Sequence, residues 1–140
     1  MSAAQAIPFR VRPLPRPGRP SVERRRRRAA GSADALALAL DRARRRGGLD
    51  VLMVADRDGL VFAHSSTRLD LSMLAAVIPL VSRRCVRVRV RRRGNPKGLT
   101  VRALNVRDEI LYVAGLGGSS QSRAREVTLG SAAVRRILTH

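Results

Sequence analysis

The spacing of apolar residues divides the chain into predicted helices and strands from Ser32 onward. Leu36, Leu40 and Ala43 recur at helical spacing, and a run of arginines followed by Gly47-Gly48 marks a helix end. Ser32 precedes this pattern and is a suitable N-cap. The pattern therefore predicts a first helix that begins at Ser32 and ends at the glycine pair.

A second helix is predicted over residues 69–84. Thr67 and Asp70 are placed to form a capping box at its start, and Pro79 must kink the helix or end it early. Apolar residues recur through the segment at the i, i+3, i+4, i+7 spacing of one helix face. They are Leu71, Leu74, Ala75, Ile78 and Val81. This helix is therefore expected to have an apolar face.

Five further segments have the composition or the alternation of strands, and a last helix follows them after a serine between residues 119 and 122. In one of them Val86, Val88 and Val90 alternate with arginines, which is the period of a strand with one dry face. The strand-like segments are residues 49–55, 60–64, 86–91, 99–106 and 110–116. The order α-β-β-α-β-β-β-α lacks the alternation that a parallel sheet needs. It predicts an α+β domain, with a five-stranded antiparallel sheet and helices on its faces.

Asp56-Arg57-Asp58-Gly59 joins the first two strands, and its two carboxylates could be a catalytic pair or part of a bend. Paired acid and base carboxylates require a pocket and separated pKa values, and the tip of a hairpin offers neither. Gly59 can take the positive φ of a hairpin turn, and an aspartate side chain can close the turn on the backbone. The motif therefore predicts a tight turn.

Residues 1–32 differ in composition from residues 33–140, which we expect to form the folded domain. The first segment holds most of the seven prolines and many arginines against a single acid, Glu23. Because it can bury little apolar surface, it is expected to be a disordered tail. Its consecutive arginines are Arg24, Arg25, Arg26, Arg27 and Arg28. They could bind nucleic acid or another anionic surface nonspecifically; an inert arm, or an extension that is not translated, is the alternative.

The net charge of +19 points to an acidic partner such as nucleic acid, an anionic membrane or an acidic protein face. An arginine-rich background would also produce scattered arginines. Phe9, Phe62 and Tyr112 are the only aromatic residues available to stack on bases, and no helix-turn-helix or zinc-finger pattern occurs. Nucleic-acid binding is therefore expected to be nonspecific.

The sequence contains no convincing arrangement for catalysis, a metal or a cofactor. Cys85 is the only cysteine, and His64 and His140 are the only histidines, which are too few and too distant for a zinc site. The loop at residues 115–125 is rich in glycine but completes neither a G-x-G-x-x-G nor a P-loop motif, so a helix cap is the simpler interpretation. We therefore predict a non-enzymatic protein without a cofactor. No apolar run approaches the roughly 20 residues of a membrane span, and a single cysteine suits the reducing cytoplasm.

The hairpin sequence DRDGLVFAHSS, together with the order of the elements, resembles the Roadblock/dynein light chain family. The stretch LSMLAAVIPLV is similar to the second helix of that family. The stretches LTVRALNVRDEILYVAGLG and REVTLGSAAVRRIL are similar to its last strands and its closing helix. The resemblance covers roughly residues 33–140 and implies a Roadblock-like fold with profilin-like layering.

The resemblance implies a non-enzymatic platform that dimerises through its second helix and third strand and binds or regulates a Ras-like small GTPase. Bacterial members of the MglB type activate a polarity GTPase without supplying an arginine finger. The partner in the dimer would be a second copy or another Roadblock-domain protein. Carried onto this chain, the interface comprises Leu71, Leu74, Val77, Ile78, Val81, Val86, Val88 and Val90.

A row of arginines occupies the strand that should meet its own copy. The row consists of Arg87, Arg89 and Arg91, followed by Arg92 and Arg93. Like charges across antiparallel strands cost up to about 1 kcal/mol per pair. We therefore hypothesise a preference for an acidic heterologous partner or for a dimer bridged by anions; the alternative is that the arginines protect an exposed strand edge. Other interpretations of the whole chain are a nucleic-acid-associated basic protein, or a heterodimer subunit of a signalling scaffold that contacts no GTPase.

Overall fold

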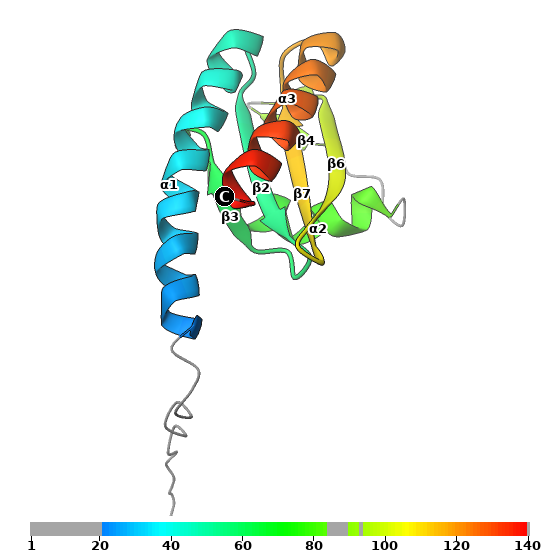
Figure 1. Ribbon diagram of the computed structural model, residues 1–140. Helices are drawn as coiled ribbons and strands as arrows, with labels where there is room; N and C mark the ends of the chain where they lie inside the picture. The colour runs from blue at the N-terminus through cyan, green and yellow to red at the C-terminus, as the bar shows by residue number, and fades with distance from the viewer. Residues whose placement is uncertain (1–20, 84–89, 93, 140) are drawn as a thin grey trace, which may run out of the picture.

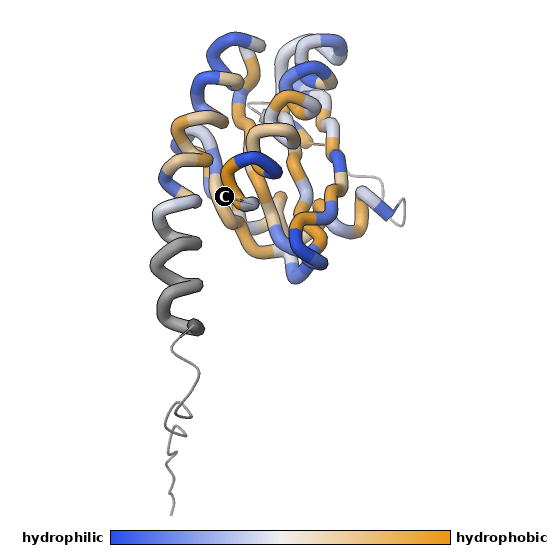
Figure 2. The backbone as a smooth tube through the Cα atoms, in the orientation of Figure 1, coloured by the Kyte–Doolittle hydropathy of each residue, from blue (hydrophilic) through white to orange (hydrophobic). Residues whose placement is uncertain are grey.

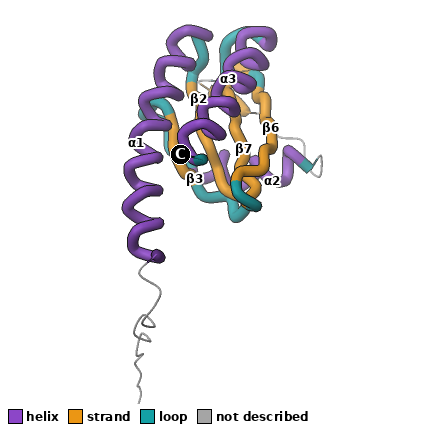
Figure 3. Tube along the Cα trace, in the orientation of Figure 1, coloured by secondary structure: helices purple, strands orange, loops and turns teal. Residues whose placement is uncertain are grey.

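The computed structural model describes residues 21–83, 90–92 and 94–139, with only the backbone at residues 21–30 and 92. These residues form three helices and six strands. The elements are α1 (Ser21–Gly47), β2 (Val51–Asp56), β3 (Val61–His64), α2 (Ser72–Ser82), β4 (Val90–Arg92), β5 (Asn95–Lys97), β6 (Leu99–Val106), β7 (Glu109–Leu116) and α3 (Ser120–Leu138). Four strands form one antiparallel sheet in the order β3-β2-β7-β6. Helices α1 and α3 cover one face of this sheet and α2 covers the other (Figures 1 and 3). The predicted mixture of helices with an antiparallel sheet is confirmed.

The sheet separates two hydrophobic cores. Side chains such as Leu52 and Val113 point toward α1 and α3, whereas Met53 and Tyr112 point toward α2. Strands β2 and β7 pair in the middle of the sheet and are covered on both faces, which explains why their sequences are apolar almost without interruption. Figure 2 shows this apolar band at the centre of the molecule.

The predicted fifth strand of the main sheet is not confirmed, because the described sheet has four strands. Strand β4 is the described end of the predicted strand at residues 86–91, and it pairs with β5 in a separate two-stranded sheet. No strand is predicted between residues 91 and 99, but Asn95–Lys97 forms β5, which makes a short hairpin with β4 and has Gly94 at a φ of +79° in the turn. Residues 84–89 lie outside the described residues, so the rest of that strand stays a prediction.

Helix α1 begins at Ser21, and our prediction that it begins at Ser32 is wrong. Residues 21–32 form its first turns, so this part of the chain, including Arg24–Arg28, is helical and not disordered. Arginine is a good helix former, and neither glycine nor proline interrupts residues 21–30. The first half of α1 projects beyond the sheet (Figure 1). Residues 1–20 lie outside the described residues, so a disordered tail there and its separation from the domain stay predictions.

The predicted capping box at the start of α2 does not form. Thr67 Oγ1 accepts a hydrogen bond from the backbone N–H of Leu69 (3.1 Å), and Asp70 Oδ1 accepts one from the N–H of Ser72 (3.0 Å). The hydrogen bond from Ser72 also lowers the pKa of Asp70. Each side chain closes its own short turn, and the N-cap position falls on Leu71, which makes no side-chain cap bond.

The hairpin between β2 and β3 is a tight turn, as its sequence predicts. Asp56 Oδ1 accepts hydrogen bonds from the backbone N–H groups of Asp58 (2.9 Å) and Leu60 (3.0 Å). Gly59 has a φ of +81°, and its N–H donates to the carbonyl oxygen of Asp56 at 3.1 Å. Asp56 is therefore the aspartate that closes the turn, and its role is structural.

Candidate functional site

Helix α2 is apolar on both sides, and one side faces solvent. Its sequence SMLAAVIPLVS contains no charged residue. The outward positions follow the i, i+3, i+4, i+7 spacing and form what we call the outer stripe: Met73, Ala76, Val77 and Leu80. Met73 is 83% exposed and Leu80 is 39% exposed. Met73, Ala76 and Leu80 are not among the interface residues predicted from the sequence; the signal that could have found them is the absence of charge from the whole helix.

The predicted interface residues divide between the interior and the surface. Leu71 and Ile78 face the sheet and are buried, Ile78 completely, so they support α2 from beneath and do not form the surface that we predicted. Leu74, Val77, Val81 and Val90 are partly exposed, whereas Val86 and Val88 lie outside the described residues. The exposed apolar surface of α2 is therefore the outer stripe with its neighbours Leu74 and Val81.

Pro79 and Gly59 set the contact between α2 and the hairpin. Proline has no N–H, so the carbonyl of Ala75 lacks its usual helical donor four residues later. Gly59 lies against this part of the helix: a Cβ at Gly59 would lie 3.3 Å from the Ala75 carbonyl oxygen and 2.9 Å from the Cα of Ala76. The missing side chain lets the hairpin approach the helix backbone. The helix continues to Ser82, so Pro79 does not end it early.

Only part of the predicted arginine row is described. Arg91 on β4 is exposed, and Arg92 is described by its backbone alone. Arg87, Arg89 and Arg93 lie outside the described residues. A continuous positive row on this strand therefore stays a prediction.

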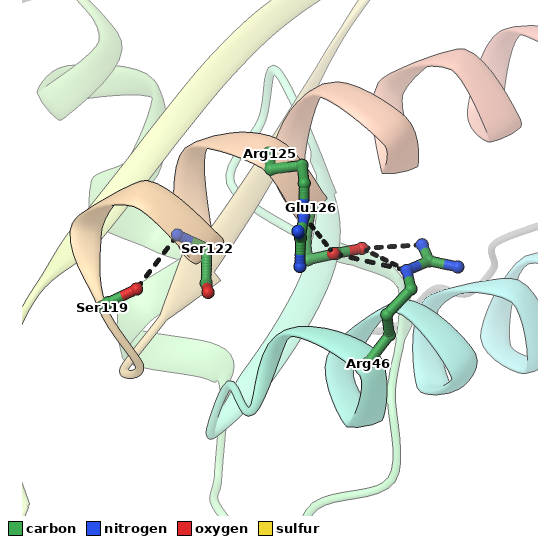
Figure 4. A network of polar contacts seen from close by, with 5 residues as sticks. All are labelled: Arg46, Ser119, Ser122, Arg125 and Glu126. Atoms are coloured by element: carbon green, nitrogen blue, oxygen red, sulfur yellow. Dashed lines mark hydrogen bonds and ion pairs between the residues drawn. The ribbon is translucent and has the colours of Figure 1, made fainter.

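A buried carboxylate joins α1 to α3 on the other face of the sheet (Figure 4). The Glu126 side chain is inaccessible; its Oε1 lies 2.7 Å from Arg46 Nη2, and its Oε2 lies 3.0 Å from Arg125 Nε. Burial alone would raise the pKa of Glu126, but the hydrogen bonds from Arg46 and Arg125 outweigh burial and lower it. The hydrogen bonds to Glu126 raise the pKa of Arg46. Glu126 is therefore ionised at neutral pH and holds the two helices together.

The glycine-rich loop before α3 acts as a helix cap, as predicted. Ser119 is the N-cap, and its Oγ accepts a hydrogen bond from the N–H of Ser122 at 3.1 Å (Figure 4). The guanidinium of Arg123 turns inward and donates to two loop carbonyls at 3.1 and 3.2 Å. Arg123 is only 8% exposed, and Arg125 is engaged with the buried carboxylate. These two arginines therefore do not converge on a common anion.

The polar residues at the end of β3 have structural partners. The Oγ of buried Ser65 accepts a hydrogen bond from the N–H of Leu52 at 3.0 Å, and His64 Nδ1 lies 2.7 Å from the carbonyl oxygen of Ser65. Cys85 and His140 lie outside the described residues. Across residues 21–83, 90–92 and 94–139, histidine, cysteine and acidic side chains form no group of three that could hold a metal ion. None of the helices in these ranges has both the length and the apolar character to cross a membrane.

Comparison with known proteins shows that this fold is shared with solved MglB structures. No protein-family model and no curated protein sequence matches the chain. Solved structures of MglB proteins do match it. One is an MglB with a tetrameric arrangement, at 16% identity and a TM-score of 0.58 over 77% of this chain and 90% of that chain. The gliding protein MglB from Thermus thermophilus matches at 17% identity and a TM-score of 0.57, over 77% of this chain and 91% of that one.

A third match is Myxococcus xanthus MglB, at 9% identity and a TM-score of 0.52, over 74% of this chain and 87% of the other. At such low identities the similarity establishes a shared fold. The chain therefore has the MglB fold, and the Roadblock-like architecture implied by the sequence resemblance is confirmed.

Proposed function

We propose that this chain is a non-enzymatic cytoplasmic module that dimerises through α2 and binds and regulates a Ras-like small GTPase. The observation that carries the proposal is the outer stripe, in which an uncharged helix exposes Met73, Val77 and Leu80 on a chain with a net charge of +19. Burying apolar surface at an interface contributes about 25 cal/mol per Å². The shared MglB fold supports the proposal, and the family resemblance supplies the class of GTPase.

If the module stimulates GTP hydrolysis, it acts on the catalytic residues of the GTPase. Ras-like proteins hydrolyse GTP faster when the residue that positions the attacking water is held in place and the charge of the transition state is stabilised. The resemblance to MglB-type proteins favours ordering of the GTPase over an arginine finger. The alternative is that this chain supplies an arginine to the active site of the GTPase. As a third possibility, the chain binds the GTPase without changing its hydrolysis rate, and a hydrolysis assay distinguishes this case from the other two.

Replacing two residues of the outer stripe should disrupt the dimer. For Met73→Glu/Leu80→Glu we expect the dissociation constant of the homodimer to rise at least about 100-fold, equivalent to about 2.7 kcal/mol, because two apolar contacts are lost and charge is introduced at the interface. Sedimentation equilibrium of the full chain measures the effect. Leu38→Glu is the matched control, since Leu38 is 64% exposed on α1, away from α2. A wild-type chain that stays monomeric would contradict the homodimer and favour a heterodimer subunit.

The regulatory part of the proposal requires a second assay. Purified Ras-like GTPases from the source organism are loaded with GTP, and single-turnover hydrolysis is followed with and without the full chain. We expect wild type and Leu38→Glu to bind one of these GTPases and change its hydrolysis rate. The double variant in α2 should lose this effect. Failure of every Ras-like GTPase to bind would exclude the proposed function even if the chain dimerises.

The arginine row gives the homodimer a salt dependence of defined direction. If Arg87, Arg89 and Arg91 face their copies across the interface, dissolved ions screen their repulsion. We therefore expect the dissociation constant of the homodimer to fall as salt rises from about 50 to about 300 mM. Arg91→Gln should reduce that dependence. A homodimer that tightens as salt is lowered would rule out the repulsion.

A further inference from the structure

A groove runs between α1 and α3, on the face of the sheet opposite to α2. Its volume is about 290 Å³. Residues at helical spacing line it from both helices: Ala39, Arg42, Ala43 and Arg46 from α1, and Leu129, Gly130, Ala133 and Arg136 from α3. The small residues Ala43 and Gly130 among them are both buried. Leu129 also lines the groove and is 46% exposed, which gives the site an apolar contact that water reaches.

Arginines make this groove cationic. Arg42 and Arg46 line it from α1, and Arg136 lines it from α3. Arg46 donates through Nε and Nη2 to Glu126, which also binds Arg125, so this carboxylate is already neutralised. Arg42 and Arg136 are exposed, and neither guanidinium forms a hydrogen bond or an ion pair with another described residue. Two guanidinium groups therefore stand beside an apolar contact with their donors available.

We propose that this groove binds an acidic, amphipathic helical segment of a partner protein. Such a segment places an apolar side chain against Leu129 and carboxylates against Arg42 and Arg136, and a guanidinium can bind a carboxylate through two parallel hydrogen bonds. A volume of about 290 Å³ is at the lower limit of pockets that enclose small ligands and suits the side chains of one helix face. A second copy of this chain matches poorly, because it has 10 acidic against 29 basic residues.

This site is separate from the surface of α2 through which we propose that the chain dimerises. The helices that line the groove, α1 and α3, lie on one face of the sheet, and α2, which carries the outer stripe, lies on the other face (Figure 1). A segment held in the groove would leave α2 free. The chain could then connect an acidic partner to whatever α2 binds, so the groove adds a second interaction surface to the module.

Binding of designed peptides to the full chain tests the proposal. The probe is a fluorescein-labelled helical peptide of about 15 residues, or four turns, with leucine along one face and glutamate elsewhere. Its matched partner has every glutamate replaced by glutamine, and a single-stranded DNA of similar length is the third probe. Arg42→Gln/Arg136→Gln removes the two available arginines. Arg57→Gln/Arg68→Gln is the control, because it removes two exposed arginines from loops outside the groove.

We expect the groove variant to bind the glutamate peptide at least about 10-fold more weakly than wild type, and the control to change less than about 2-fold. Leu129→Ser should also weaken binding, and the glutamine peptide should bind at least about 10-fold more weakly than the glutamate peptide. Three results would overturn the proposal: equal losses in the groove and control variants, no binding of the glutamate peptide to wild type, or DNA bound more tightly than the peptide through Arg42 and Arg136. The first would assign the binding to net charge and the last to a nucleic-acid site.

Discussion

Replacing Gly59 with alanine should destabilise the domain by about 3 kcal/mol or more, because two costs fall on the same added atom. Gly59 has a φ of +81°, where a residue with a side chain is strained by roughly 1–2 kcal/mol. A Cβ there would also lie 2.9 Å from the Cα of Ala76 and 3.3 Å from the Ala75 carbonyl oxygen. Both are backbone atoms of α2 and cannot rotate away, so the hairpin and the helix must separate. Urea unfolding measures the loss of stability.

Gly48→Ala is the matched control for this experiment. Gly48 follows α1 with a φ of +65°, and a Cβ at Gly48 would meet no atom within 4 Å. It should therefore cost only the strain of positive φ, about 1–2 kcal/mol. Because Gly59→Ala displaces α2, it should also weaken the homodimer, which Gly48→Ala should leave unchanged. Equal destabilisation by the two variants would mean that the contact between hairpin and helix contributes little.

Local rules in the sequence were sufficient for the turn and for most of the element order. The aspartate that closes the hairpin and the glycine with positive φ lie within four positions of each other, so their interaction depends on no distant part of the chain. The predicted start of α1 is wrong because the proline-rich composition before Ser21 does not extend to the arginines that follow it, which favour a helix. Composition averages over a segment and does not locate a helix end.

The outward face of α2 could not be chosen from the sequence. An amphipathic helix reveals its buried side because the other side is polar, but α2 is apolar all round. Leu71 and Ile78 are two turns apart on one side of the helix, and Met73 and Leu80 are two turns apart on another side. From the sequence, either side could have faced the sheet. Packing against β2 and β7 determines which side of α2 is buried, and that packing depends on the order of strands in the folded sheet.

The ion pair between Arg46 on α1 and Glu126 on α3 could not be predicted from the sequence either. Arg46→Ala should destabilise the domain by about 2–3 kcal/mol. The Glu126 side chain is inaccessible whereas that of Arg46 is 53% exposed, so the carboxylate depends on the guanidinium more than the reverse. Breaking a fully buried pair costs about 3–5 kcal/mol; the estimate is lower here because Arg125 still binds Glu126. Arg45→Ala is the control, since Arg45 is 70% exposed and pairs with Asp41 at the surface. It should change stability little.

The dependence on pH and a second substitution separate this ion pair from ordinary packing. Arg46→Ala/Glu126→Gln should be more stable than Arg46→Ala, because the buried charge is gone. In the wild type, burial raises the pKa of Glu126, but its arginine partners lower it below the usual 4.5. The ion pair therefore stabilises the fold fully above pH 4.5 and progressively less as pH falls through the lowered pKa. Urea unfolding between about pH 7 and 3 should show the gap between wild type and Arg46→Ala narrowing in acid, and a constant gap would mean that Arg46 acts only through packing.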